Sequence, residues 1–232
     1  MLFFLIGFVS ALAGVGGGVF FVPLLIYYGF EPHVAVGTSS IAVAITTTVG
    51  GLGYYRAGLF DKRITLKAAL SAYPGVILGV FLSVSIPEII KPAIGLMLFL
   101  SGYRAFKSFS VPERLQAPSF FITGLLVGLL GIGGGAILTP VIVSTSGYDL
   151  VHSLGIAYTT MPLLTIVAAV LHILYGEPDI IRGIKIGLLA SLGSYSGAKF
   201  VSKYRRRVRI RHLIGVIMFL VGGYMIASRI FR

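Results

Sequence analysis

Residues 14–18 of this chain read Gly-Val-Gly-Gly-Gly, and residues 131–135 read Gly-Ile-Gly-Gly-Gly, 117 positions later in a sequence of 232 residues. Each copy follows an apolar run, and a proline stands five residues after its last glycine, at Pro23 and Pro140. Glycines interrupt a helix because they have no side chain and lose much backbone entropy on folding. Duplicated helix breaks within apolar sequence are typical of membrane carriers, in which freed backbone groups and helix ends hold a polar substrate.

The composition indicates a membrane protein. Hydrophobic residues make up 56% of the chain and charged residues only 11%, whereas charged residues make up about a quarter of soluble domains. The mean hydropathy is +0.98. A helix needs about 20 apolar residues to cross a bilayer, and runs of this kind recur along most of the sequence. Cysteine is absent, which excludes disulfides and thiolate metal sites, and we expect no cofactor and no bound metal.

The repeat extends well beyond the glycines. At an offset of 118 residues, Asp61 matches Asp179 and Gly75 matches Gly193. An internal duplication of this length predicts two similar structural units. We expect a first transmembrane repeat at residues 1–106, a connector at residues 107–118 and a second transmembrane repeat at residues 119–232.

Each repeat reads as an interrupted helical element followed by three helices, so the predicted fold class is an all-α polytopic membrane protein. Asp61 and Asp179 each precede a predicted helix, and we expect their carboxylates to cap these helices rather than to act in catalysis. In the first repeat the four segments span Leu2–Tyr28, Val34–Tyr55, Thr65–Ile86 and Glu88–Phe106. In the second repeat they span Ser119–Thr145, Leu150–Leu174, Ile180–Ser202 and Val208–Arg229.

Length alone leaves two threadings open for each interrupted element, a kinked span or a re-entrant hairpin of two half-helices. The placement of Lys and Arg separates them, because cytoplasmic loops collect these residues. If the elements span the membrane, the two faces collect 11 and 8 basic residues; if they are re-entrant, the faces collect 14 and 5. This asymmetry favours re-entrant hairpins. Each half then crosses the membrane three times, which makes the two repeats inverted and puts both termini outside.

The net charge of +12 has its densest run at Lys203–Arg211, where six of nine residues are basic. A nucleic-acid site is one interpretation of such a run. Because this run joins two apolar segments, we expect it instead on the cytoplasmic face, next to anionic lipid headgroups. We therefore expect no nucleic-acid partner.

Together, these motifs resemble the sulfite exporter TauE/SafE family, also called the toluene sulfonate uptake permeases. The resemblance rests on the duplicated Gly-x-Gly-Gly-Gly with its proline, on Val-Gly-Thr-Ser-Ser at residues 36–40 and on the two four-segment halves, and it covers essentially the whole chain. It implies a bacterial or archaeal plasma-membrane permease for small sulfur-containing or organic anions, such as sulfite, sulfonates or sulfoacetate. The second half departs from the pattern, since residues 155–160 read Gly-Ile-Ala-Tyr-Thr-Thr, so the two halves need not contribute equally.

Helix ends at the glycine breaks also indicate an anionic substrate. A helix N-terminus carries roughly half a positive charge and up to four unpaired N–H groups, so two such ends near the membrane midplane match about one negative charge. Ser and Thr hydroxyls would complete the site. The alternative is that the glycines allow close packing and that the hydroxyls bond their own helices. The predicted substrate-binding residues are Gly16, Gly17, Gly18, Thr38, Ser39, Ser40, Gly133, Gly134, Gly135, Thr159 and Thr160.

His172 is the candidate coupling residue, because apart from tyrosines it is the one titratable residue well inside a predicted span; a packed, hydrogen-bonded histidine is the alternative. An anion-selective channel is a second function class, because re-entrant elements also form selectivity filters. An intramembrane hydrolase would pair a serine of residues 37–40 with His152 or His172. The chain lacks a nucleophile motif for this, so we expect no enzyme. At 24.7 kDa the chain is small enough to act as a homodimer.

Overall fold

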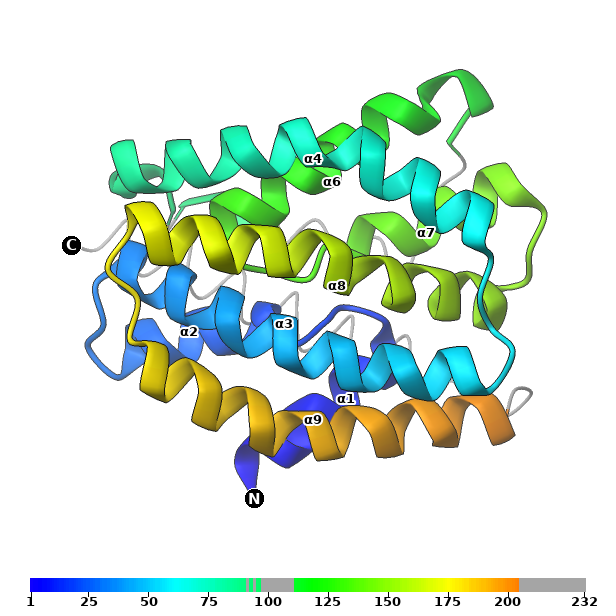
Figure 1. Ribbon diagram of the computed structural model, residues 1–232, viewed down its shortest axis with the longest axis horizontal. Coiled ribbons are helices and arrows are strands. Elements are labelled where there is room, and N and C mark those ends of the chain that lie inside the picture. Colours follow the sequence, from blue (N-terminus) through cyan, green and yellow to red (C-terminus); the bar gives the residue numbers. More distant parts are fainter. Residues whose placement is uncertain (91, 94, 97–110, 205–232) are drawn as a thin grey trace.

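The computed structural model describes residues 1–90, 92–93, 95–96 and 111–204 (Figure 1). Every regular element within these residues is a helix, which confirms the all-α prediction. Most of the predicted segment Glu88–Phe106 and all of Val208–Arg229 lie outside the described residues, as do residues 205–211 of the basic run.

In each half, the interrupted element forms two shorter helices, and two long helices follow. The break falls at the glycines, as predicted, and α6 begins three residues before the predicted start at Ser119. The first half contains α1 (Leu2–Ala13), α2 (Gly18–Tyr27), α3 (Pro32–Arg56), α4 (Lys62–Ser85) and the 3₁₀ turn η1 (Pro87–Ile89). The second half follows the 3₁₀ turn η2 (Glu113–Leu115) and contains α6 (Gln116–Leu130), α7 (Gly135–Ser146), α8 (Leu150–Tyr175) and α9 (Ile180–Lys203).

Local sequence explains where these helices start and stop. Gly14 ends α1 with a φ of 70°, and Gly131 ends α6 with a φ of 62°. Glycine adopts this left-handed conformation readily, and the conformation turns the chain out of the helix. Both predicted caps are confirmed: the Asp61 and Asp179 carboxylates accept hydrogen bonds from the backbone N–H three residues ahead, at 3.0 and 2.9 Å.

Helix lengths separate full spans from half spans. Three helices, α3, α4 and α8, are long and apolar enough to cross a membrane, with 25, 24 and 26 residues. At 1.5 Å per residue they reach about 36–39 Å. By contrast, α1 and α7 have 12 residues each and α2 has 10. These three reach about 15–18 Å, roughly half the hydrocarbon thickness, which is the length that a hairpin arm needs.

The first arm of the first hairpin, α1, packs on α9 of the other half. Gly193 of α9 lies against the Phe4 backbone, and Gly197 lies against the Phe8 backbone one turn later. An added Cβ on either glycine would collide with these backbone atoms, so glycine is what allows the two helices to approach this closely. Because both residue numbers rise together along the contact, α1 and α9 run in the same direction.

The equivalent contact joins α6 of the second half to α4 of the first. Gly75 and Gly79 of α4 lie against the Phe121 and Leu125 backbones of α6. These four residues are the repeat partners, at offsets of 117 and 118, of the four residues that join α1 to α9. The halves therefore exchange their first arms, and α6 also runs in the same direction as the helix on which it packs.

The long helices show that the chain reverses its direction at the first glycine break. Near its start α3 packs on the start of α9, where Ile41 meets Gly183, and near its end Gly53 meets Ala198, so α3 and α9 are parallel. Since α1 is also parallel to α9, α1 and α3 run in the same direction, although α1 starts about midway along α9, where Phe4 meets Gly193. Gly18 at the start of α2 meets Val43 of α3, and a short turn leads from the end of α2 into the start of α3, so α2 runs opposite to α1 and α3.

The two hairpins enter the bundle from opposite ends. Gly37, near the start of α3, lies against His172 near the end of α8, whereas Gly51 lies against Tyr158 near the start of α8, so α3 and α8 are antiparallel. The turn between α2 and α3 consequently lies at one end of the bundle and the turn between α7 and α8 at the other (Figure 1). How these ends face a membrane, and hence the inverted topology, stays a prediction.

Candidate functional site

The two glycine breaks cross each other inside the bundle. A Cβ added to Gly16 would lie 2.8 Å from the Gly133 Cα, and a Cβ added to Gly133 would lie 2.9 Å from the Gly16 Cα. Real Cβ atoms do not approach other carbon atoms this closely, so a side chain at either position would push the two breaks apart. Residues 14–18 and 131–135, which we call the glycine crossing, are all buried. The crossing therefore joins the two halves backbone to backbone.

The crossing also brings helix ends together. Gly17 and Gly134 are the N-caps of α2 and α7, and neither helix has a side-chain cap. The N-terminal N–H groups of both helices thus begin within the buried interior, where they attract negative charge.

Carbonyl groups from the opposite hairpin lie against these helix starts. The Gly14 carbonyl oxygen, at the end of α1, faces Gly135, and the Gly131 carbonyl oxygen, at the end of α6, faces Gly18. Helix C-termini carry partial negative charge, so each one offsets part of the positive end beside it. The field available to an anion is smaller than the two N-termini alone would supply, and side-chain donors matter more as a consequence.

Two of the predicted hydroxyls reach the crossing from α3. The Ser39 hydroxyl donates to the Gly131 carbonyl oxygen at 2.9 Å. The Ser40 hydroxyl oxygen lies 3.1 Å from the position of a Cβ on Gly131, and it donates to Val36 of its own helix. The structure therefore groups Ser39 and Ser40 with the predicted glycines, and Ser39 specifically neutralises one of the carbonyl groups there.

The other predicted hydroxyls make contacts elsewhere. Thr38 accepts a hydrogen bond of 2.9 Å from the Asp179 backbone N–H, at the start of α9. Thr160 donates to the carbonyl of its own helix four residues earlier, at 2.8 Å. Thr159 does the same at 3.0 Å and lies against Gly51 of α3. No described contact joins these three hydroxyls to the crossing.

Three further side chains lie at the crossing. The Met161 sulfur lies 3.0 Å from a Cβ position on Gly16 and 3.1 Å from one on Gly133. The Thr47 and Thr165 hydroxyls lie 3.3 Å apart, and the Thr47 methyl group contacts Gly16. Thr47 and Thr165 are repeat partners, so the matching hydroxyls of the two halves are a sequence signal for these two residues. Met161 gave no such signal, since its repeat partner is Val43.

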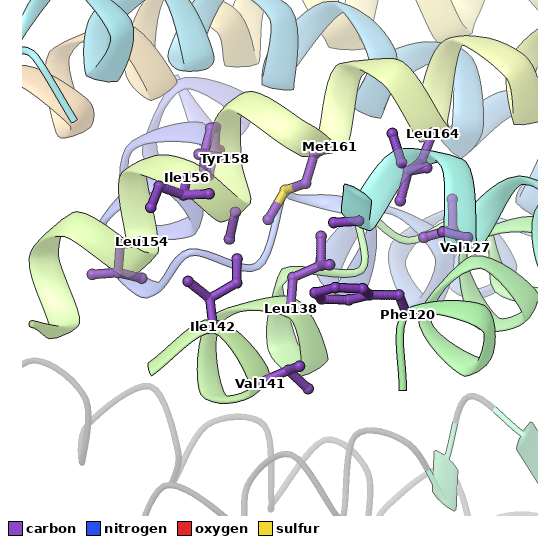
Figure 2. Close-up of a cluster of buried hydrophobic side chains, with 14 of the residues drawn as sticks. Phe120, Val127, Leu138, Val141, Ile142, Leu154, Ile156, Tyr158, Met161 and Leu164 are labelled. Carbon is purple, nitrogen blue, oxygen red and sulfur yellow. The ribbon is translucent and has the colours of Figure 1, made fainter. Parts of the chain in front are cut away.

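An apolar cluster holds α7 beside the crossing. Leu138 and Ile142 of α7 are fully buried together with Phe120 of α6 and with Met161 and Leu164 of α8. Figure 2 shows Met161 extending from α8 toward α7, and Leu138 next to the Phe120 ring. The side chains of α7 that pack in this cluster are therefore apolar. Thr139, on the same helix, is polar.

His172 has a counterpart in the first half. Its Nε2 lies 3.0 Å from the Gly128 carbonyl oxygen near the end of α6, and the Tyr54 hydroxyl donates to the Ala11 carbonyl oxygen near the end of α1 at 2.8 Å. Tyr54 and His172 are repeat partners, and so are Ala11 and Gly128. Each side chain bonds the first arm of its own half to the following long helix. The same structural contact is thus made by a tyrosine in the first half and by a histidine in the second.

Comparisons with known proteins agree with this architecture. The family model of the sulfite exporter TauE/SafE matches residues 1–225. The chain is similar to a probable membrane transporter protein, YdhB, of Bacillus subtilis, with 26% identity over 87% of this chain and 89% of that protein. It is similar to the probable membrane transporter protein MJ0441 of Methanocaldococcus jannaschii, with 26% identity over 96% and 92% of the two chains. No solved structure matches the chain.

Proposed function

Since the chain belongs to the sulfite exporter TauE/SafE family and is a membrane transporter, we propose that it moves a small sulfur-containing or organic anion by alternating access around the glycine crossing. Sulfite and sulfonates are the substrates that the family description and the earlier resemblance suggest. The transporter names of its relatives also fit a protein that is not an enzyme.

The observation that carries this proposal is the meeting of two uncapped helix N-termini in the buried centre of the bundle. No described span needs a buried Lys or Arg for this arrangement, which avoids the cost of a charge at the centre of a bilayer. The Ser39 hydroxyl supports anion binding indirectly, because it draws negative charge from the Gly131 carbonyl beside the start of α2.

Hairpins that enter from opposite ends support an alternating mechanism. In carriers of this architecture, one repeat rocks against the other so that a central site opens to one side at a time. We propose a multi-pass protein of the plasma membrane with inverted repeats and both termini outside. Lys203–Arg211 then lies on the cytoplasmic face beside anionic headgroups.

Cysteine labelling tests this topology directly, because the chain has no native cysteine. Phe30 lies in the turn between α2 and α3, and Tyr148 lies in the turn between α7 and α8. Single cysteines at these positions should react with an impermeant thiol reagent from opposite faces of the membrane. Labelling from the same face would exclude the inverted topology.

Transport by the purified protein tests the function. Proteoliposomes should take up sulfite or a sulfonate with saturation, and substrate inside the vesicles should accelerate uptake by exchange. The rates of sulfate and simple carboxylate uptake, measured in the same vesicles, define the selectivity. A conductance that rises linearly with voltage and does not saturate would identify a channel instead, and failure to move every anion in the panel would refute the proposal.

A further inference from the structure

Thr139 differs from most threonines of the described helices; Thr65 in α4 is the other one whose hydroxyl is buried without a partner. Its hydroxyl oxygen is buried without a hydrogen-bond partner, and only 7% of the residue is exposed. A buried hydroxyl without a partner destabilises a protein, so nearly all such groups are paired in folded proteins. Eight other threonines donate to the carbonyl four residues earlier in their own helix: Thr46, Thr47, Thr48, Thr123, Thr145, Thr159, Thr160 and Thr165.

The unpaired hydroxyl lies at the glycine crossing. Thr139 stands four residues after Gly135, so both residues occupy the same face of α7. The Thr139 hydroxyl oxygen is 3.3 Å from the position of a Cβ on Gly14, and Gly135 lies against the Gly14 carbonyl. The hydroxyl therefore faces the same short stretch of backbone as the N-terminus of α7.

Helix α2 of the first half has no such donor at the corresponding position. The repeat partner of Thr139 is Val22 in α2, which is fully buried in an apolar cluster. The two helix N-termini at the crossing are thus alike in backbone and different in chemistry. Only α7 combines its N-terminal N–H groups with a side-chain hydroxyl that is free to donate.

We propose that the Thr139 hydroxyl and the N-terminus of α7 form the oxyanion-binding subsite of the carrier, and that the N-terminus of α2 is its structural counterpart. This inference rests on the proposed function. The ligand group is an oxyanion such as sulfite or a sulfonate, because its oxygens only accept hydrogen bonds, and the Thr139 hydroxyl and the N-terminal N–H groups of α7 are donors. Rocking the hairpins apart would move the Gly14 carbonyl away from Gly135 and open these donors to substrate.

Two substitutions test the subsite. Thr139→Val keeps the shape of the side chain, removes the hydroxyl and reproduces the residue of the first half; Thr139→Ser keeps a hydroxyl. We expect Thr139→Val to raise the KM for sulfite uptake by about tenfold, since a hydrogen bond to a charged group is worth roughly one such factor or more. Thr139→Ser should stay within about threefold of the wild type.

Thermal stability separates binding from folding. Because the hydroxyl has no protein partner, its removal should leave the melting temperature of the purified protein unchanged or raised. The matched control is Thr46→Val, which removes a buried hydroxyl that already bonds Ala42 of its own helix. This control should lower the melting temperature slightly and leave the KM unchanged.

The outcomes distinguish this inference from the proposed function. An unchanged KM in Thr139→Val, measured while the wild type transports sulfite, overturns the subsite alone. A lower melting temperature in Thr139→Val also overturns it, because the hydroxyl would then have a protein partner. A wild-type protein that takes up no oxyanion overturns both proposals.

Discussion

In the first half of the molecule Val22 follows the glycine break and α3 carries Ser39 and Tyr54, whereas Thr139, Ala157 and His172 occupy the corresponding positions of the second half. The backbone contacts of the two breaks are nevertheless paired: Gly14 meets Gly135, and Gly18 meets Gly131. The duplication therefore preserved the backbone geometry of the crossing, while the side chains around it diverged. Effects of substitution should accordingly be similar in both halves for backbone contacts and different for side-chain donors.

The largest expected effect belongs to the crossing itself. Gly16 combines a φ of +82° with close contact to Gly133; Gly133 has the close contact without a positive φ, and Gly29 has a φ of +86° with open space around it. Gly16→Ala should prevent folding. Gly133→Ala should lower the free energy of unfolding by about 1–3 kcal/mol through overpacking. Gly29→Ala should lower it by about 1–2 kcal/mol through backbone strain. Circular dichroism melting in detergent measures this series. Equal losses for Gly16→Ala and Gly29→Ala would show that the crossing does not require glycine.

The paired hydrogen bonds of Tyr54 and His172 come next. Tyr54→Phe and His172→Phe each remove the donor to a carbonyl of the first arm, so both should lower stability by a similar amount, about 1–3 kcal/mol. His172→Gln retains a donor and should lose less. We also expect His172→Gln to keep the pH dependence of uptake, because the histidine acts here as a structural donor. Loss of that dependence at an unchanged melting temperature would make His172 the coupling residue.

A smaller effect is expected at Ser39. Ser39→Ala makes the first half resemble the second, which has Ala157 at this position. Without the hydroxyl, the Gly131 carbonyl keeps its full partial charge beside the start of α2, which disfavours an anion. The KM for sulfite should rise about two- to fivefold, in keeping with one neutral hydrogen bond. Thr48→Val, which removes an exposed hydroxyl bonded to its own helix, is the control. Unchanged kinetics in Ser39→Ala would remove this residue from the site.

The smallest effect is expected at the end of the bundle. The Tyr148 hydroxyl donates to the Asp61 carboxylate at 2.9 Å, whereas the repeat partner of Tyr148 is Phe30, which packs under Arg182. The backbone N–H of Ile64 lowers the pKa of Asp61, and the Tyr148 hydroxyl lowers it further. Tyr148→Phe should therefore reduce the melting temperature slightly at pH 7.

The lowered pKa of Asp61 determines how the stability difference between wild type and Tyr148→Phe should change with pH. A carboxylate with a lowered pKa stabilises the folded protein above its ordinary pKa of 3.8, and this contribution is lost as the pH falls through the lowered value. The difference between wild type and Tyr148→Phe should accordingly shrink as the pH falls below about 4. A difference that persists in acid would show that packing of the ring, and not the hydrogen bond, is responsible.

Local signals made much of this fold predictable. The glycine breaks and the caps Asp61 and Asp179 depend on residues close together in sequence, and the structure confirms them. The spacing of Gly75 and Gly79 indicated close helix packing, but it could not name α6 as the partner, because nothing local to α4 encodes that choice. Exchange of the first arms is a property of the complete fold and became visible only in the structure.

Predictions for the site were limited in the same way. A list of hydroxyls does not reveal which of them are already bonded, so Thr38, Thr159 and Thr160 were named together with Ser39. Thr139 stood out only when its missing partner could be seen in three dimensions. The usable signal was its mismatch with Val22, since a polar residue opposite an apolar repeat partner marks a position where the two halves have diverged.

The exchanged arms also have a consequence for synthesis. Gly75 and Phe121 are separated by 46 residues, but Phe4 and Gly193 are separated by 189. At about 5–20 residues per second, α1 waits roughly 10–40 s for the surface on which it packs, whereas α6 finds α4 already made. The two equivalent interfaces of this duplicated fold therefore form at different times, the one between α4 and α6 early in synthesis and the one between α1 and α9 late. Helix α1 can therefore dock only after α9 has been made, and until then its packing face lacks its partner.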